Sequence, residues 1–339
     1  MTTIIDVAEH AGVSVKTVSR VMNDYPHISK RMRVRVEASM KALSYAPSTI
    51  ARQMRLGDTQ SIGMLYGDPS SGYQSRLNHA VLKACSDAGR YLAVEFFDES
   101  EPDWRSQVAG FLDRTRVSNI ILVPPMCDSE ELHDLLEDRG VRVVLISPSR
   151  QIPGSSSIAM DDRKAAKEIT NYFISLGHKK IGHIAGDPTH VVTLLRRQGF
   201  EEALVSAGLV CDQSYILGAG SFQFREALAC AETLLTMPER PTAIFAANDE
   251  MAAAVIMVAN KLGIAVPGEL SVAGFDNTSI SETMWPALTT VAQPFGEIAR
   301  QAVDLIGKRR DKDNRMSATY VLPHEIILRE STGPAPVSI

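Results

Sequence analysis

The fold is decided first by Asp6-Val7-Ala8-Glu9-His10-Ala11-Gly12-Val13-Ser14-Val15-Lys16-Thr17-Val18-Ser19-Arg20-Val21-Met22-Asn23. This stretch predicts two short helices around a tight turn. In the first helix, apolar residues recur at i, i+3, i+4 and i+7, as Ile4, Val7, Ala8 and Ala11. Gly12 can adopt the left-handed backbone that ends a helix, and Ser14 is a good N-cap for the next one. Such a pair is typical of a helix-turn-helix, whose second helix enters the DNA major groove.

The second helix separates an apolar face from a polar one. Its inner face carries Val18, Val21 and Met22. Its outer face carries Val15, Lys16, Ser19 and Arg20. Because Lys16 and Arg20 are four residues apart, they lie on one side, where each can donate to guanine O6 and N7. On spacing alone, a small amphipathic hairpin with a solvated charged face is the alternative.

A third helix is predicted after Ser29, which can cap it. One face carries Val36, Ser39, Met40 and Leu43, so three helices can close a small core. Its start carries four basic residues that could meet phosphates, Lys30, Arg31, Arg33 and Arg35. For any one of these four, an ordinary solvated charge is an equal alternative.

Charge is divided unevenly along the chain. Residues 1–60 hold nine Lys/Arg and five Asp/Glu, a net of +4. All 339 residues hold 35 and 40, which leaves 26 and 35 for residues 61–339, a net of −9. A basic head on an acidic body suits phosphate binding by the head alone. The length predicts two or three domains, because a single core rarely grows so large.

Composition excludes several classes of protein. A chain that is 45% hydrophobic and 22% charged is globular. It has no signal-peptide pattern and no run of about 18 apolar residues, so we expect a cytoplasmic protein without a membrane partner. The four Cys are far apart and form no Cys/His cluster, so we expect buried thiols and no metal. The sequence has no GxSxG, Walker or HExxH motif, so we expect neither enzymatic activity nor a bound cofactor.

Residues 47–60 are predicted to link head and body. Pro47 ends the third helix, and residues 48–56 can form one or two helical turns before Gly57. So short a helix is marginal alone and would order only when held, for instance against DNA and a partner copy. Met54 could then wedge between base steps in the minor groove. An equal alternative is that Met54 packs on its own domain.

From residue 61, apolar runs alternate with amphipathic stretches. Strands are predicted at Ser61–Tyr66, Leu92–Phe97, Asn119–Pro124, Arg142–Ser147, Ser157–Met160, Lys180–Ala185, Tyr215–Gly218, Ala243–Ala247 and Leu270–Phe275. Helices are predicted at Arg76–Ala88, Trp104–Thr115, Ser129–Arg139, Lys164–Leu176, Val191–Ala207, Phe222–Thr236, Glu250–Leu262 and Phe295–Arg309. This alternation predicts α/β structure with parallel sheets, in two domains.

Ligands of open α/β sheets bind beyond the carboxyl ends of the strands. The candidate site segments are therefore Gly67–Tyr73, Pro124–Cys127, Ser147–Arg150, Asp161, Gly186–His190, Asn248–Asp249 and Asp276–Asn277.

The motifs together resemble those of the LacI/GalR family of transcriptional regulators. The head matches over residues 6–23, and the linker matches at Tyr45-Ala46-Pro47-Ser48, Ala51-Arg52 and Ser61-Ile62-Gly63. Further matches are residues 176–182, 247–252, 270–277 and 288–294, so the resemblance covers essentially the whole chain. It implies a helix-turn-helix domain at 1–46, a hinge at 47–60, and a periplasmic-binding-protein-like sensor at 61–339. The sensor's N-subdomain would take about 61–160 and 292–320, and its C-subdomain about 161–291 and 321–339.

The resemblance also implies an effector site between the subdomains. By position it would use Tyr73, Arg196, Phe222, Asn248, Asp276 and Gln293. Fixed polar groups beside aromatic rings suit a sugar. A purine would also stack on Phe222, so the class of effector stays open. Asp276 capping a turn and Phe222 lying in the core are alternatives.

For the head, the resemblance places Val15, Lys16 and Arg20 on base edges. It places Ser14, Thr17, Asn23, His27 and Ser29 near phosphates. Met54 stands where the family usually has Leu, and Met32 where a small polar residue is common, which weakens the case for one phosphate contact. No leucine heptads follow the last predicted strand, so we expect a homodimer on a near-palindromic operator.

The sequence thus predicts a dimeric, DNA-binding transcriptional repressor under control of a small effector, most plausibly a sugar. The alternative is a carbohydrate-binding or carbohydrate-modifying protein with an incidental N-terminal helical extension. Deleting residues 1–60 separates the two.

Overall fold

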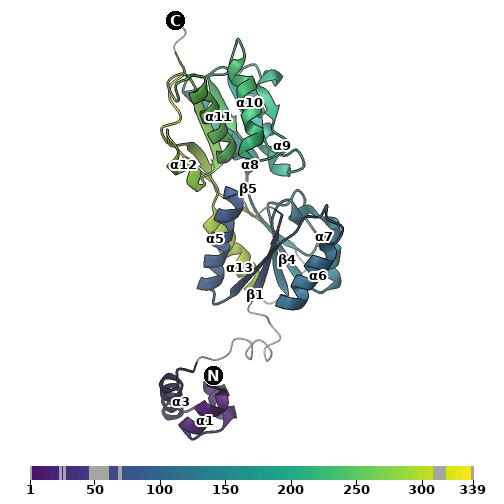
Figure 1. Cartoon of the computed structure of the whole chain (residues 1–339), viewed down its shortest axis with the longest axis vertical. Coiled ribbons are helices and arrows are strands. Elements are labelled where there is room, and N and C mark those ends of the chain that lie inside the picture. The colour runs from purple at the N-terminus through teal and green to yellow at the C-terminus, as the bar shows by residue number, and fades with distance from the viewer. Residues whose placement is uncertain are drawn as a thin grey trace. The chain divides into compact units, whose positions relative to one another are not determined.

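The computed structural model describes residues 2–22, 25, 28–45, 61–67, 71–307 and 318–336. The chain divides into two compact units, Met1–Gln60 and Ser61–Ile339 (Figure 1). The predicted contacts of Asn23, His27 and Met54, and the predicted hinge at 47–60, lie outside the described residues. The domain limits therefore remain a prediction.

Unit 1 contains the three predicted helices, α1 (Ile4–Ala11), α2 (Val15–Met22) and α3 (Lys30–Ala42). Gly12 has φ 59° and ends α1, because it adopts the left-handed region at little cost. Ser14 Oγ accepts the Thr17 N–H at 3.1 Å, and Ser29 Oγ accepts the Met32 N–H at 3.3 Å. The core joins all three helices through Val7, Ala8, Ala11, Val18, Val21 and Val36. The helix-turn-helix prediction is confirmed.

The first lobe of unit 2 is built on a six-stranded parallel sheet of order β11-β5-β4-β3-β1-β2. Its strands are β1 (Ser61–Tyr66), β2 (Tyr91–Phe96), β3 (Asn119–Leu122), β4 (Arg142–Ile146), β5 (Ser156–Met160) and β11 (Thr319–Leu322). Its helices are α5 (Gly72–Asp87), α6 (Trp104–Thr115), α7 (Glu130–Asp138) and α13 (Phe295–Gly307). Figure 1 shows α5 and α13 on one face and α6 and α7 on the other. Both faces are buried, which explains the nearly continuous apolar runs.

The second lobe repeats this plan with the order β12-β10-β9-β8-β6-β7. Its strands are β6 (Ile181–Ala185), β7 (Ile216–Gly218), β8 (Ala243–Ala246), β9 (Ser271–Asp276), β10 (Thr289–Ala292) and β12 (Glu325–Ile327). Its helices are α8 (Asp162–Ser175), α9 (Val191–Ser206), α10 (Phe224–Thr236), α11 (Asp249–Lys261) and α12 (Ser279–Thr283). Pairs in this sheet are parallel except β10 with β12. The predicted α/β class with parallel sheets is confirmed.

The chain passes between the lobes three times. The crossovers join β5 to α8, β10 to α13, and β11 to β12. Each lobe is therefore assembled from segments distant in sequence. Across the described ranges, no helix is both long and apolar enough to cross a membrane.

Sequence reasoning missed β10, β11, β12 and α12. These elements are three to five residues long, too short to show a period. In β10, Thr289 and Thr290 are buried and hydrogen-bonded, so the strand lacks an apolar run.

Three predicted helix starts were wrong, and all three errors concern the site. Helix α8 starts at Asp162 rather than Lys164, because Asp161 caps it. Helix α5 starts at Gly72 rather than Arg76, because Ser71 caps it, and Tyr73 lies in its first turn. Helix α10 starts at Phe224 rather than Phe222, which leaves Phe222 in the preceding loop.

Candidate functional site

The outer face of α2 is the candidate DNA-contacting surface. Val15, Lys16 and Arg20 are exposed there, while Val18 and Val21 on the opposite face are buried. The Arg20 guanidinium lies 5.3 Å from the centroid of the Tyr25 ring. The apolar face of α2 packs in the core of the head, and the opposite face presents basic side chains to solvent. A recognition helix requires this arrangement.

The predicted phosphate contacts Ser14, Thr17 and Ser29 lie at helix starts. The Ser14 and Thr17 hydroxyls are 2.9 Å apart, and Ser14 and Ser29 also cap α2 and α3. These hydroxyls therefore have a structural role independent of DNA.

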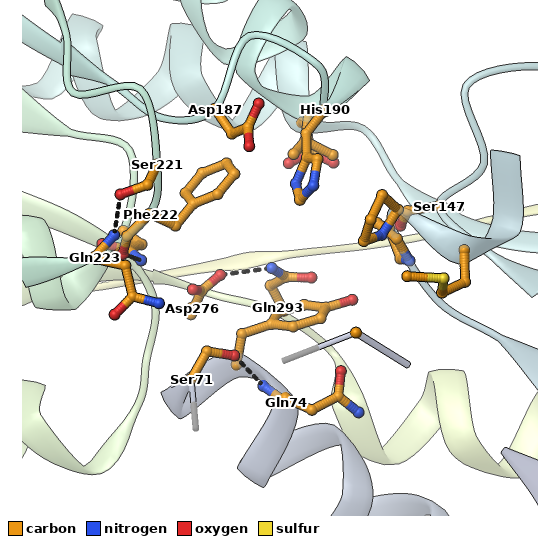
Figure 2. A pocket seen from close by; sticks show the side chains of 18 of the residues that line it. Ser71, Gln74, Ser147, Asp187, His190, Ser221, Phe222, Gln223, Asp276 and Gln293 are labelled. Carbon is orange, nitrogen blue, oxygen red and sulfur yellow. Dashed lines mark hydrogen bonds between the residues drawn. The ribbon is translucent and has the colours of Figure 1, made fainter. Parts of the chain in front are cut away.

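The second candidate site is a cleft of about 490 Å³ between the lobes of unit 2. All six residues predicted for effector binding line it: Tyr73, Arg196, Phe222, Asn248, Asp276 and Gln293. The structure thus brings together side chains spread over more than 200 positions of the chain. Figure 2 shows three of them, Phe222, Asp276 and Gln293, around one space. Most follow the carboxyl ends of strands, as expected for parallel sheets.

Arg196 of α9 is already engaged by protein groups. Its Nε and Nη2 lie 2.8 Å from Asp162 Oδ1, and Nη1 donates to Ala247 O at 2.6 Å. The guanidinium carbon also lies 3.6 Å from the centroid of the Phe275 ring. Burial raises the pKa of Asp162, and Arg196 opposes that rise. A guanidinium has five N–H groups, so two are left to face a ligand.

Asp162 was missed as a site residue, although the preceding Asp161 was a candidate. It opens α8 directly after the first crossover, and it lines the cleft. Its ion pair with Arg196 therefore fixes this crossover to α9. Nothing local in the sequence identifies the pair, because the partners lie 34 residues apart.

Asp276 and Gln293 form a second polar pair at the cleft. Gln293, in the second crossover, donates from Nε2 to Asp276 Oδ1 at 2.6 Å (Figure 2). Asp276 has φ 103°, a strained conformation for a residue with a side chain. Burial raises the pKa of Asp276 to about 8, with Arg196 opposing. A buried carboxyl of this kind can hold a proton near neutral pH and donate it to a ligand oxygen.

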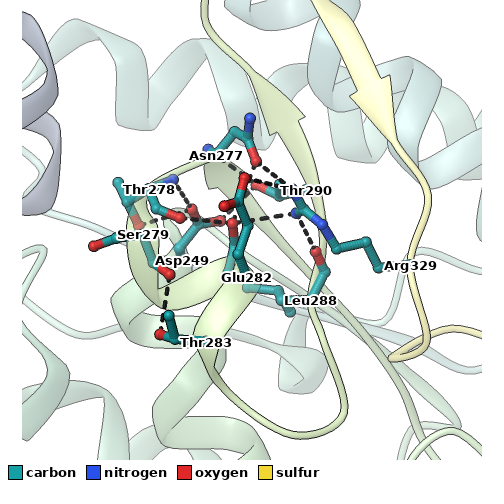
Figure 3. Close-up of polar contacts among 10 residues, drawn as sticks. Asp249, Asn277, Thr278, Ser279, Glu282, Thr283, Leu288, Thr290 and Arg329 are labelled. Carbon is teal, nitrogen blue, oxygen red and sulfur yellow. Dashed lines mark hydrogen bonds and ion pairs between the residues drawn. The ribbon is translucent and has the colours of Figure 1, made fainter.

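The loop that carries Asp276 is fixed by polar contacts behind it (Figure 3). Asp249 accepts from Thr278 N at 2.6 Å and from Thr290 Oγ1 at 2.5 Å. Arg329 donates to Asn277 Oδ1 at 2.7 Å and to Leu288 O at 2.8 Å. These bonds connect β9, β10 and the C-terminal segment, so they hold the strained turn in place.

Aromatic rings form an apolar wall. The Phe222 and His190 rings lie 5.3 Å apart with an interplanar angle of 32°. A Cβ at Gly186 would clash with the Phe222 ring, so glycine is needed there. Phe222 lines the cleft and also packs on the edge of the second lobe's core. Tyr73 packs edge-on against Phe295 at 5.4 Å, and burial raises the pKa of Tyr73.

Asn248 positions this wall. Its Oδ1 caps α11 by accepting the Met251 N–H at 2.8 Å, and its Nδ2 donates to Phe222 O at 2.8 Å. Asn248 thus fixes the Phe222 backbone at the cleft. Among the residues that the structure describes, no cluster of His, Cys, Asp or Glu is arranged to hold a metal ion.

A helix-turn-helix head joined to a two-lobed, periplasmic-binding-protein-like body defines a class of ligand-responsive DNA-binding regulator. Residues 3–48 match the family described as bacterial regulatory proteins, lacI family, and residues 170–332 match the periplasmic binding protein-like domain. The chain is 30% identical to the transcriptional repressor PurR of Photobacterium profundum, over 98% of both chains. It is 32% identical to catabolite control protein A of Priestia megaterium, over 97% of this chain and 99% of the relative. The chain belongs to the LacI family and is a DNA-binding transcriptional regulator.

Solved structures agree with this assignment. The lac repressor dimer bound to operator and an anti-inducer matches with a TM-score of 0.81 and 27% identity, over 98% of this chain and 99% of that one. A complex of the regulator CelR with cellobiose matches with a TM-score of 0.73 and 26% identity, over 98% and 100%. These similarities include the head, so they disfavour the alternative of an incidental helical extension.

Proposed function

We propose that this protein is a cytoplasmic, homodimeric repressor that binds a near-palindromic operator through α2 and changes operator affinity when a small, sugar-like effector occupies the cleft. The observation that carries the proposal is that all six predicted effector residues line one cleft, in a chain that also has an exposed basic helix face. Lys16 and Arg20 would read base edges, and Ser14, Thr17 and Ser29 would approach phosphates.

The cleft chemistry supports a sugar. Asp276, Gln293 and Arg196 offer fixed donors and acceptors to hydroxyl groups, and the Phe222 and Tyr73 rings offer cover for an apolar ring face. The relatives do not agree on one class of effector, since one is named PurR and one solved neighbour holds cellobiose. A nucleobase is therefore the alternative that any ligand screen must include.

Exposed apolar side chains support the homodimer. Leu82 of α5 and Tyr91, Val94 and Phe96 of β2 are exposed on the first lobe. On the second lobe, Met257 is exposed and Trp285 is 80% exposed. Exposed apolar side chains of this size suit contact with a partner, and a second copy is the occupant we propose.

The test is operator binding by the full-length protein. We expect a palindromic site selected from random duplexes to bind at least about 1000-fold more tightly than random DNA at physiological salt. Deleting residues 1–60 should abolish this binding while leaving a folded sensor. Equal affinity for random and selected DNA would refute the proposal.

A further inference from the structure

We propose that the effector of this cleft is uncharged, and that the cleft excludes phosphorylated sugars, nucleotides and other anions. The proposal rests on the proposed function, since it concerns the ligand of the same site. Two observations support it: carboxyl groups outnumber basic groups around the cleft, and the one basic group, Arg196, is already bonded to protein groups.

Acidic side chains outnumber basic ones around the cleft. Four carboxyl groups line it, from Asp98, Asp162, Asp187 and Asp276. Among the described lining residues, Arg196 is the one permanently charged cation. Hydrogen bonds from Ser100 lower the pKa of Asp98, and those from Thr189 lower the pKa of Asp187 against its partial burial. An anion entering this space would therefore meet the negative charges of Asp98 and Asp187, which costs several kcal/mol per close pair.

The single cation is already compensated. Arg196 forms a buried ion pair with Asp162 through two nitrogens at 2.8 Å. A third nitrogen donates to Ala247 O. A phosphate would have to share Arg196 with a carboxylate that cannot move away, because Asp162 is fixed at the start of α8. His190 does not add a second permanent positive charge, since burial lowers its pKa.

Helix N-termini at the cleft, where anions often bind, are largely occupied. The Gly72 N–H of α5 donates to Glu250 Oε1 at 2.9 Å, and Ser71 caps the same helix. Asn248 caps α11, and Asp161 caps α8. Helices α9 and α10 start without a side-chain cap, but Asp187 lies just before α9 and Glu226 lies in the first turn of α10. The N-termini of α5, α8 and α11 are thus already paired with protein acceptors, and those of α9 and α10 have a carboxyl group nearby in sequence.

The remaining groups suit hydroxyls better than ammonium ions. Asp276 uses one oxygen for Gln293, and its raised pKa lets it donate as well as accept. A hydroxyl can satisfy either state, whereas an ammonium ion requires the charged form. The Phe222 and His190 rings beside it would cover an apolar ring face.

The test uses the full-length protein with inorganic phosphate as the first probe. Melting temperature is measured against phosphate and against sodium chloride at equal ionic strength. We expect phosphate to give no more stabilisation than chloride in the wild type. We expect Asp187→Asn to make phosphate binding measurable, while the exposed control Asp304→Asn should behave as the wild type. Specific stabilisation of the wild type by phosphate would overturn the proposal.

Matched ligands give the second readout. Calorimetry compares glucose with glucose 6-phosphate and glucosamine, ribose with ribose 5-phosphate, and inosine with inosine monophosphate. For any set that binds, we expect the uncharged member to bind about 100-fold more tightly than its phosphate ester. Tighter binding of a phosphate or an ammonium compound would overturn the proposal. If no set binds, the phosphate titration decides. Operator affinity, measured on the same samples, separates this outcome from failure of the proposed function.

Discussion

The carboxylate of Glu250 on α11 accepts a hydrogen bond from the backbone N–H of Gly72, the first residue of α5, at 2.9 Å. This bond joins the two lobes beside the cleft. A negative charge at a helix N-terminus is favourable because it meets unpaired N–H groups and the positive end of the helix dipole. The contact is close, since a Cβ at Gly72 would lie 3.0 Å from Thr278 Cγ2.

Weakening this contact should open the sensor. We expect Glu250→Gln to cost the closed form about 1 kcal/mol and Gly72→Ala to cost more, because its methyl group would press on Thr278. Pulsed electron resonance between labels at Arg105 and Val205, with Cys211 and Cys230 replaced by Ser, measures the lobe separation. Glu232→Gln, an exposed change within the second lobe, is the control. An unchanged distance distribution in both Glu250→Gln and Gly72→Ala would contradict this role.

Removing Arg196 should destabilise the sensor as well as alter effector binding. Arg196→Ala leaves Asp162 buried without its partner, which typically costs about 3–5 kcal/mol. Adding Asp162→Asn should recover part of that loss, because the unpaired charge is removed. Denaturant unfolding of the two single variants and the double variant measures the coupling. Additive effects of the two changes would show that the pair is not coupled.

Lys16 should determine sequence preference. We expect Lys16→Ala to relax discrimination at one base pair of each half-site by about 1–3 kcal/mol. Competition binding against operators with each base substituted measures it. Lys41→Ala, in the last turn of α3, is the control and should leave base preference intact. A uniform loss of affinity on every sequence would instead identify Lys16 as a phosphate contact.

Asp276 should make stability fall as pH rises. Its native pKa of about 8 lies above the value of 3.8 for a free carboxyl, so the folded state binds the proton more tightly. Its contribution is complete below about pH 4 and declines by up to about 1.4 kcal/mol per pH unit until about pH 8. Asp276→Asn mimics the protonated form, so it should remove this slope and be the more stable protein at pH 8. If the free energy of unfolding changed with pH in the same way in the variant and the wild type, the raised pKa of Asp276 would be contradicted.

The exposed apolar residues should control assembly. We expect Leu82→Asp or Trp285→Asp to weaken a homodimer at least about tenfold, because a buried charge replaces an apolar contact. Sedimentation equilibrium measures the dissociation constant. Val210→Asp, an equally exposed apolar position outside this set, is the control. Weakening by Val210→Asp alone would place the interface elsewhere.

Much of the fold follows from local sequence signals. The helices of the head, their caps at Ser14 and Ser29, and the nine predicted strands each depend on residues within a few positions of one another. The same holds for the strand-end segments that supply much of the cleft. The starts of α5 and α10 were misplaced because Gly72 and Phe222 give weak local signals, although both lie at the site.

The sequence by itself determined the class of each domain, because periodicity and capping act over one or two helical turns. With the resemblance to a known family, it also predicted the six side chains that the structure brings to the cleft. Tertiary structure decided what those side chains do there. The bond of Gly72 to Glu250 spans 178 positions and the pair of Asp162 with Arg196 spans 34, so no local pattern encodes either one. Burial of Arg196, Asp162 and Asp276 between the lobes determines which charges the cleft presents to a ligand.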